Sequence, residues 1–206
     1  VVEYAIEYSV SLGDNIKTVV STDIEPLIDF CRRNKINYIR RDPSLCTDKS
    51  SIDDVLADAI KKKGEDCNYC SIVYGNIPVR YPCIFHNALK FLENHTEYDA
   101  VISMQNIEKF HPDWMLDFNR TVLPKKECKN YRRQTLSQKM IHDGHTLIFK
   151  IGGFYKRYKG LIEYDKRYMY SVFGEKIKPL INNELIVDID TEKDFKFAKA
   201  ILLNYK

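Results

Sequence analysis

Two carboxylates near the C-terminal end of the chain give its most specific chemical signal. Asp188 and Asp190 stand two residues apart at the end of a predicted strand, 185–189. Because alternate residues of a strand share one face, the two side chains are expected to project together. Mg²⁺ commonly takes one or two carboxylates together with substrate phosphates, so the pair predicts a magnesium site. A plainer interpretation stays open, in which Asp190 helps to cap the following helix and Asp188 is only solvated.

Three further segments place polar or basic groups where they could bind an anion. Ser21–Asp23 lies between a predicted strand and a helix N-terminus, where backbone N–H groups favour negative charge. Gly75 permits close backbone approach after the predicted strand 69–74, and Arg80 could hold a phosphate or a carboxylate. The segment 132–134 contains two guanidinium forks, which suit bidentate binding of an anionic partner. Each segment also fits an ordinary cap, turn or solvated surface.

An alternation of helix and strand patterns surrounds these segments. Apolar residues recur at helical or strand spacing, and Ser, Thr and Asp stand where helices should begin. The predicted helices are 1–11, 50–59, 84–92 and 192–203, with another after Asp23, and the predicted strands are 16–20, 37–39, 69–74, 100–104 and 185–189. This order predicts an α/β domain with a largely parallel sheet.

The rhythm breaks between about residues 119 and 168. Basic residues cluster here and alternate with tyrosines, which indicates an insertion or an oligomer arm, or else a solvated surface. The segment also carries apolar side chains, too many to leave in water as one patch: Phe149, Ile151, Phe154, Tyr155, Leu161 and Ile162. We therefore expect a two-fold dimer formed through this arm. The alternative is an arm that folds back onto its own domain.

Composition limits the class of protein. The chain has 206 residues, 44% hydrophobic and 30% charged, which suits a single domain spanning 1–206. We expect neither a nucleic-acid nor a membrane partner, because the net charge is only +3 and no apolar run reaches about 18 residues. Six scattered cysteines predict reduced thiols in the cytosol, and the single CxxC, Cys67–Cys70, is a weak zinc signal. The start at Val1, without a Met, suggests a fragment or a processed product.

Several of these segments together resemble the acylneuraminate cytidylyltransferase family, the CMP-sialic acid synthetases and their relatives. The pieces stand in the family's order over 1–203: Ser21-Thr22-Asp23, Arg40-Arg41-Asp42-Pro43, Thr47-Asp48-Lys49-Ser50-Ser51, Pro78-Val79-Arg80, Arg132-Arg133-Gln134, Asp143-Gly144, and Asp188-Ile189-Asp190-Thr191 followed by Asp194-Phe195. The resemblance implies a three-layer α/β/α fold of the nucleotide-diphospho-sugar transferase type, which is Rossmann-like. It also implies transfer of CMP from CTP to an acidic sugar, with release of pyrophosphate.

The resemblance further implies roles for single residues. Asp188 and Asp190 would hold the Mg²⁺ that bridges CTP, and Arg80 would lie near the phosphate or sugar end. The residues near the nucleotide would be Ser21, Asp23, Arg41 and Ser51, and those near the sugar acid Tyr74, Asn76, Arg132, Arg133, Gln134 and Asp143. Members of the family commonly pair through an arm like 119–168, so Arg132 to Gln134 would reach the sugar acid across a homodimer.

Some family features are missing from this chain. The glycine-, lysine- and arginine-rich loop that grips the triphosphate would precede Val1, so we expect these 206 residues alone to bind CTP weakly and to lack measurable turnover. Tyr74 stands where the family usually has Gln, Asn76 where related transferases have a metal-binding Asp, and Asp143 where the family has Asn. Two alternatives therefore stay open: a non-catalytic module for nucleotide sensing or dimerisation, and a transferase that uses UDP- or GDP-sugars.

Overall fold

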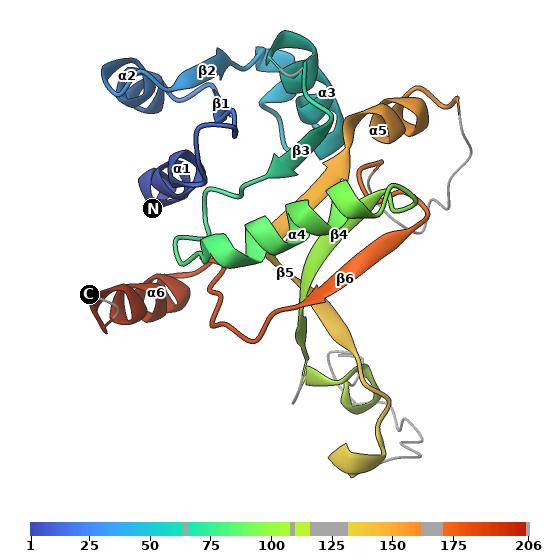
Figure 1. Cartoon of the computed structure of the whole chain (residues 1–206). Helices are drawn as coiled ribbons and strands as arrows, with labels where there is room; N and C mark the ends of the chain where they lie inside the picture. Colours follow the sequence, from blue (N-terminus) through green and yellow to red (C-terminus); the bar gives the residue numbers. More distant parts are fainter. Residues whose placement is uncertain (64–65, 108–109, 116–131, 162–170, 205–206) are drawn as a thin grey trace.

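A mixed α/β architecture runs through residues 1–63, 66–107, 110–115, 132–161 and 171–204, which the computed structural model describes (Figure 1). Its α-helices are α1 Val2–Ser11, α2 Glu25–Arg33, α3 Ile52–Lys63, α4 Pro82–Asn94, α5 Ile151–Tyr158 and α6 Glu192–Asn204. Its strands are β1 Val19–Thr22, β2 Asn37–Arg40, β3 Tyr69–Ile72, β4 Ala100–Asn106, β5 Met140–Lys150 and β6 Ile177–Ile181. Short 3₁₀ helices are η1 Pro43–Leu45, η3 Pro112–Trp114 and η4 Arg133–Thr135. The α/β class expected from the sequence is confirmed.

The described strands form two sheets. β1 and β2 pair in parallel, with Val19 opposite Asn37. The larger sheet has the order β3-β5-β4-β6. In it β5 runs antiparallel to both of its neighbours, and β6 runs parallel to β4. The sheet is therefore mixed rather than largely parallel, because β5, an inner strand, runs opposite to the strand on each side of it.

Successive side chains of β4 and β5 point alternately into two hydrophobic cores, one on each face of the sheet. On one face, Ala100 and Phe149 pack with α3 and α5. On the other face, Val101 and Ile148 pack with α1 and α4, and Figure 1 shows α4 crossing over these strands. Because successive strand residues point to opposite faces, helices cover both sides of the sheet. This is the three-layer α/β/α arrangement that was predicted.

Local sequence sets the helix boundaries. At the start of α3, the Asp54 N–H donates to Ser51 Oγ at 3.1 Å and Ser51 Oγ donates to the Asp54 carboxylate at 2.6 Å, a reciprocal cap. Pro26 and Pro82 lie in the first turns of α2 and α4, where a missing N–H loses no helical hydrogen bond. None of the helices in the described part of the chain has both the length and the apolar character that a membrane span needs.

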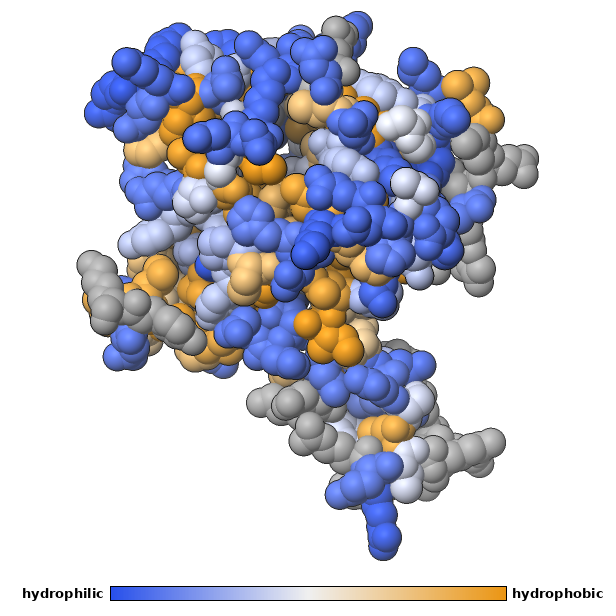
Figure 2. Space-filling view, viewed as in Figure 1, coloured by the Kyte–Doolittle hydropathy of each residue, from blue (hydrophilic) through white to orange (hydrophobic). Residues whose placement is uncertain are grey.

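The expectation that 119–168 stands apart from the sheet is wrong for its second half. β5 lies between β3 and β4, and α5 packs on the same sheet. Phe149 and Phe154 are fully buried inside the chain, so they give no argument for a dimer. Leu161 remains exposed, and Figure 2 shows such apolar side chains in small groups on a largely hydrophilic face. Residues 116–131 and 162–170, including Ile162, lie outside the described residues.

The prediction of a strand at 185–189 is also wrong. These residues make no strand ladder in the structure, and β6, Ile177–Ile181, pairs with β4 in its place. β6 is not predicted by the sequence because Lys178 and Pro179 interrupt its apolar pattern. A proline fits there because β6 is at the edge of the sheet, where one side needs no ladder hydrogen bond.

Replacing Phe149 by Ala should lower the free energy of unfolding by about 3–5 kcal/mol, because the lost ring leaves a cavity between the sheet and α5. Ile141→Ala is the matched control on the same strand. Its side chain is 58% exposed, so the change should stay below about 0.5 kcal/mol. Urea denaturation measures both variants. Two equally small losses would mean that β5 is not part of the core.

Candidate functional site

The loop after β3 and the segment before α6 meet at one point. Asn76 Nδ2 donates to Asp188 Oδ1 at 2.5 Å, and the Ile189 N–H donates to the Asn76 carbonyl at 3.0 Å. A side-chain bond and a main-chain bond therefore join two segments 112 residues apart in the sequence. Two of the predicted site residues, Asn76 and Asp188, are in direct contact.

Residues 187–190 keep the alternation of a strand although they pair with no strand in the described part of the chain. Val187 is buried and Ile189 is half-buried, both against α6. Asp188 and Asp190 are exposed. Both carboxylates therefore lie on the solvent side of one extended segment, and the apolar side chains between them fasten that segment to the domain.

Asp194, rather than Asp190, caps α6. Its carboxylate accepts the Thr191 N–H at 2.9 Å and the Thr191 hydroxyl at 2.7 Å, and its own N–H donates to Thr191 Oγ1 at 3.3 Å. The hydrogen bonds from Thr191 lower the pKa of Asp194. Within the described residues the Asp190 carboxylate forms no hydrogen bond or ion pair, which leaves it free for a ligand.

Negative charge accumulates at Asp188. Partial burial, followed by the carboxylates of Asp190 and Asp194, raises the pKa of Asp188. Arg80 and the hydrogen bond from Asn76 act in the opposite direction. A cation at this place would relieve the repulsion between the carboxylates and bring the pKa down again.

The oxygen donors at this point suit a cation that arrives with a phosphate ligand. No group of three or more His, Cys, Asp or Glu side chains that could hold a metal ion occurs in the part of the chain that the structure describes. Asp188 and Asp190 supply two carboxylates, and Mg²⁺ is usually bound by one or two carboxylates while phosphate oxygens and water complete its octahedron. The residues present therefore fit Mg²⁺ bound together with a nucleotide.

Arg80 fastens the loop after β3 to the sheet. Its Nε donates to the Ile77 carbonyl at 3.1 Å, one terminal nitrogen donates to the Tyr74 carbonyl at 2.9 Å, and the other donates to the His145 carbonyl on β5. Its Cζ lies 5.5 Å from the centroid of the Tyr8 ring on α1. Burial lowers the pKa of Arg80 to about 10, so the guanidinium is charged at neutral pH. Every nitrogen of this side chain already donates to the backbone.

His145 is buried in its neutral form. The Tyr81 N–H donates to Nε2 at 2.7 Å, so Nε2 is the acceptor, and Nδ1 carries the proton that it donates to Thr146 Oγ1 at 2.7 Å. Burial, followed by the positive charge of Arg80, lowers the pKa of His145 to about 4. The imidazole thus ties the start of α4 to β5, which is a structural role.

Asp143 joins β4, β5 and the end of β6. Its Oδ1 accepts hydrogen bonds from Ser103 Oγ and, at 2.9 Å, from the His145 N–H. Its Oδ2 accepts from Asn182 Nδ2 at 2.6 Å. Both carboxylate oxygens are therefore bonded to groups of the protein, which gives Asp143 a structural role whatever else it contacts.

The next position, Gly144, needs a glycine because of its backbone conformation and its close packing. Its φ is +71°, and a Cβ there would come 2.5 Å from Ile77 Cδ1. The β4–β5 register shifts beside it, between Ile102 and Met104. Glycine alone fits a left-handed backbone packed this closely against the loop that carries Asn76.

A second group of predicted residues gathers at the end of β1. Arg41 Nε donates to Ser21 Oγ at 3.3 Å, and Arg41 Nη2 donates to the Ser21 carbonyl at 2.6 Å. Asp23 lies beside Cys46, since burial and then the Asp23 carboxylate raise the pKa of that thiol. Ser51 serves as the cap of α3. None of the described hydrogen bonds links this group to the Asn76–Asp188 contact.

The predicted sugar-acid residues 132–134 lie far from both groups. The Arg132 carbonyl accepts the Thr135 N–H at 3.0 Å at the start of η4, and Arg132 and Gln134 are exposed. Figure 1 shows this segment beyond the sheet, next to the end of β5 that is farther from α5. The side chain of Arg133 lies outside the described residues. Within one chain, the structure does not bring this segment to Asp188.

Residues that hold the site in shape escaped the sequence analysis, among them Tyr8, Ser103 and Asn182. Ser103 carried a usable signal, because it is a fully buried polar residue in the predicted apolar strand 100–104. A buried hydroxyl needs a partner, and here the partners are Asp143 and Thr146. Asn182 follows a strand that was not predicted, so nothing marked it.

Comparison with known proteins gives this arrangement a context. No family model matches the chain. N-acylneuraminate cytidylyltransferases of Streptococcus agalactiae serotype V and serotype III are each 25% identical to it over 197 residues, 93% of this chain. The chain resembles the N-acylneuraminate cytidylyltransferases. The resemblance drawn from the motifs is confirmed, and the chain spans 44% of the length of these relatives.

Solved structures of nucleotidyltransferases share the fold. A CMP:2-keto-3-deoxy-manno-octonic acid synthetase complexed with CTP has a TM-score of 0.71 at 12% identity, covering 100% of this chain and 88% of that one. A 4-diphosphocytidyl-2C-methyl-D-erythritol synthase from Anaerococcus prevotii has a TM-score of 0.63 at 15% identity, covering 98% and 86%. The nucleotide-diphospho-sugar transferase fold predicted from the sequence is thereby confirmed.

The lowered pKa of His145 should make stability depend on pH. The unfolded histidine titrates near 6.5 and the folded one near about 4, so between these values only the unfolded chain binds the proton. The contribution of His145 to the free energy of unfolding is full above about pH 6.5 and is lost as the pH falls to about 4. This loss amounts to about 3 kcal/mol. His145→Gln should remove this part of the pH dependence, measured by denaturation at a series of pH values.

The exposed His86 provides the control, because His86→Gln should keep the wild-type pH dependence. If the His145→Gln curve instead fell in parallel with the wild-type curve between about pH 6.5 and 4, the buried neutral histidine would not be the cause.

Proposed function

We propose that the protein transfers CMP from CTP to an acidic sugar of the sialic acid type. The oxygen of the anomeric hydroxyl attacks the α-phosphorus of CTP. The bond from that phosphorus to the oxygen bridging to the β-phosphate breaks, pyrophosphate leaves, and the hydroxyl proton is released to solvent. The chain spans 44% of the length of its curated relatives, so the activity and the substrates of the whole protein are proposed rather than shown.

The contact between Asn76 and Asp188 carries this proposal. It joins the loop after β3 to the segment with two outward carboxylates, in a chain that is similar to cytidylyltransferases over 93% of its length. Carboxylates repel a triphosphate unless a cation lies between them. Asp188 and Asp190 would therefore hold Mg²⁺ together with the phosphates of CTP. When bound, the cation neutralises charge on the phosphates and favours in-line displacement.

The protein's own residues orient the nucleotide. In the proposal, Ser21, Asp23 and Arg41 contact the nucleoside part of CTP, since Arg41 already holds the end of β1 in a defined shape. Ser51 acts through the first turn of α3. Arg80 is a positioning residue in this scheme, because its donors hold the loop that presents Asn76.

The sugar acid needs residues that the chain does not bring to its own site. We propose a two-fold dimer in which Arg132, Arg133 and Gln134 of one chain approach Asp188 of the other. The support is the place of this segment beyond the end of β5, away from α6, which begins shortly after Asp188 (Figure 1). Tyr74, Asn76 and Asp143 would act from the same chain as Asp188, since Arg80 lies near Tyr74, Asp143 and Asp188, and Asn76 is bonded to Asp188.

The state of the cysteines fits a cytoplasmic reaction. Cys31, Cys46, Cys67, Cys70 and Cys83 are free thiols. Burial, followed by the neighbouring Cys67, raises the pKa of Cys70 to about 12, so this thiol is poorly suited to redox or metal chemistry. Free thiols are typical of proteins in a reducing compartment.

A non-catalytic module is the second candidate, and the same contact favours it. Asn76 presents an amide N–H to Asp188 where related transferases have a carboxylate, so the site contains one acid fewer. Such a module would bind nucleotide or dimerise without turnover. A transferase that uses UDP- or GDP-sugars would share the fold and differ in the base that it prefers.

The test uses the full product of the gene, with Mg²⁺, CTP and a panel of nonulosonic acids. We expect pyrophosphate release that requires both CTP and a sugar acid. Asp188→Asn should lower kcat/KM on the order of 100-fold, because one charged metal ligand is lost while the fold is kept. Asp66→Asn, at an exposed carboxylate remote from the site, is the control and should leave the rate unchanged.

Thermal stabilisation by the four nucleoside triphosphates separates the alternatives. CTP should stabilise the protein most. Stabilisation by CTP without pyrophosphate release would favour the non-catalytic module, and preference for UTP or GTP would favour the other class of transferase. Full activity of Asp188→Asn would contradict the assignment of the metal site.

A further inference from the structure

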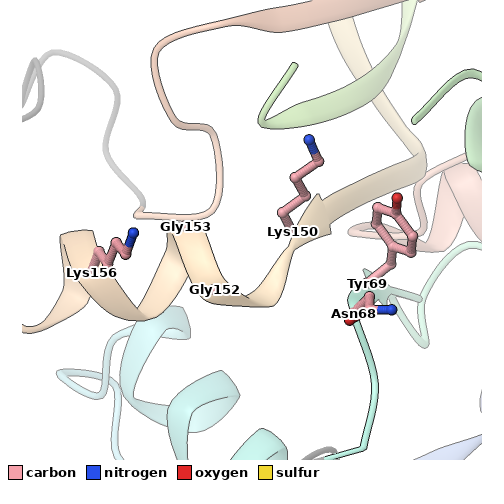
Figure 3. Close-up of a pocket in the computed structure, with 6 residues that line it drawn as sticks. All are labelled: Asn68, Tyr69, Lys150, Gly152, Gly153 and Lys156. Carbon is pink, nitrogen blue, oxygen red and sulfur yellow. The ribbon is translucent and has the colours of Figure 1, made fainter. Parts of the chain in front are cut away.

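The loop after β3 lies beyond the paired part of the sheet. β3 starts at an open hollow of about 380 Å³, where Figure 3 shows Tyr69 and Lys150, and it ends at Ile72. The residues that follow, 73–81, pair with none of the described strands. The place of Asn76 in this loop therefore depends on the side chains that pack against the loop.

Helix α1 contacts this loop at two points (Figure 1). Near the start of the helix, Val2 lies against Gly75, since a Cβ at Gly75 would come 3.2 Å from Val2 Cγ2. Near the end of the helix, Cζ of Arg80 lies over the ring of Tyr8, 5.5 Å from the ring centroid. Because the two contacts flank Asn76 in the sequence, α1 fastens both ends of the segment that presents this residue.

The ring of Tyr8 is placed to act through its aromatic face. Only 8% of Tyr8 is exposed, and its ring packs on the imidazole of His145 in a T-shaped arrangement with the centroids 5.9 Å apart. Burial raises the pKa of Tyr8 to about 12, so the phenol is neutral and forms no ion pair with Arg80. The ring therefore offers the guanidinium the negative potential of its face.

The guanidinium of Arg80 needs this contact because its other partners are uncharged. Nε and both terminal nitrogens donate to backbone carbonyls, so the side chain keeps its full charge in a half-buried place. Burial lowers the pKa of Arg80 to about 10, which shows that solvation of the charge is lost there. Cation–π contacts are strongest where the cation is poorly hydrated, so the Tyr8 ring offsets part of this loss.

We propose that Tyr8 is a positioning residue of the candidate active site and that it acts through the face of its ring. The ring holds the guanidinium of Arg80, and Arg80 holds the loop. The loop in turn presents Asn76 to Asp188. This role rests on the function proposed above, because the loop would shape a site for CTP.

Hydrogen exchange of the Ile189 amide in the full product of the gene tests the proposal, since this N–H donates to the Asn76 carbonyl. Tyr8→Phe keeps the ring, so exchange should stay within about twofold of the wild type. A trifluorinated phenylalanine at the same position has almost the same shape, but fluorine withdraws electrons from the ring face. Exchange at Ile189 should then become about fivefold faster, while Ile148 in the core changes by less than about twofold.

This measurement needs no turnover, so it separates the inference from the proposed function. If both are correct, the trifluorinated ring should also lower kcat/KM about fivefold relative to Tyr8→Phe. Faster exchange at Ile189, in a protein whose wild type releases no pyrophosphate, would support the role of Tyr8 in holding the loop and would contradict the proposed reaction alone.

Tyr4 on the same helix is 49% exposed and provides the control, because a trifluorinated phenylalanine there should leave exchange at Ile189 unchanged. In Arg80→Met, the two ring variants at position 8 should exchange equally fast, because the cation that the ring holds is gone. An effect of fluorination that persists in Arg80→Met would overturn the proposal. So would equal exchange of the two ring variants when Arg80 is present, or equal acceleration at Ile189 and Ile148.

Discussion

The half-buried guanidinium of Arg80 fastens the candidate site to the sheet. Its hydrogen bonds reach carbonyls of Tyr74 and Ile77 within the loop after β3 and the carbonyl of His145 on β5. Hydrogen bonds from a charged donor are stronger than neutral ones, and a carbonyl left buried without a donor costs about 1–3 kcal/mol. Because the loop has no strand ladder of its own, its shape depends on this side chain. The positive charge also lies beside the carboxylates of Asp143 and Asp188, and it opposes the rise in the pKa of Asp188 that partial burial causes.

From Arg80 the bonding continues in two directions. Toward the solvent, the loop carries Asn76, which is bonded to Asp188 and to the N–H of Ile189, and so brings the two outward carboxylates next to the loop. Toward the core, the His145 N–H is bonded to Asp143, which also accepts hydrogen bonds from Ser103 and Asn182. The position of the carboxylates is thus set by the interior of the sheet. This explains why many of the residues between the core and the site are polar yet buried.

Local patterns predicted the helices α1, α3 and α6 because caps and apolar spacing are properties of neighbouring residues. They failed where the structure of a segment depends on a partner that is far away in the sequence. The segment 185–189 alternates as a strand does, yet none of the strands that the structure describes pairs with it. β5 has a run of polar residues and a glycine at 142–146 and β6 contains Pro179, so neither reads as a strand until its place in the sheet is known. Among the site residues, the shared side of Asp188 and Asp190 follows from spacing alone, whereas the contact of Asn76 with Asp188 spans 112 residues and leaves no local trace.

Amide hydrogen exchange at Ile189 tests the central role of Arg80 most directly. The Ile189 N–H donates to the Asn76 carbonyl, so it is protected only while the loop keeps its shape. In Arg80→Met the loop should open locally, and exchange at Ile189 should become at least about tenfold faster than in the wild type. Exchange at Ile148, fully inside the sheet, should change much less. Unchanged protection at Ile189 in Arg80→Met, or an equal loss at Ile189 and Ile148, would contradict the account.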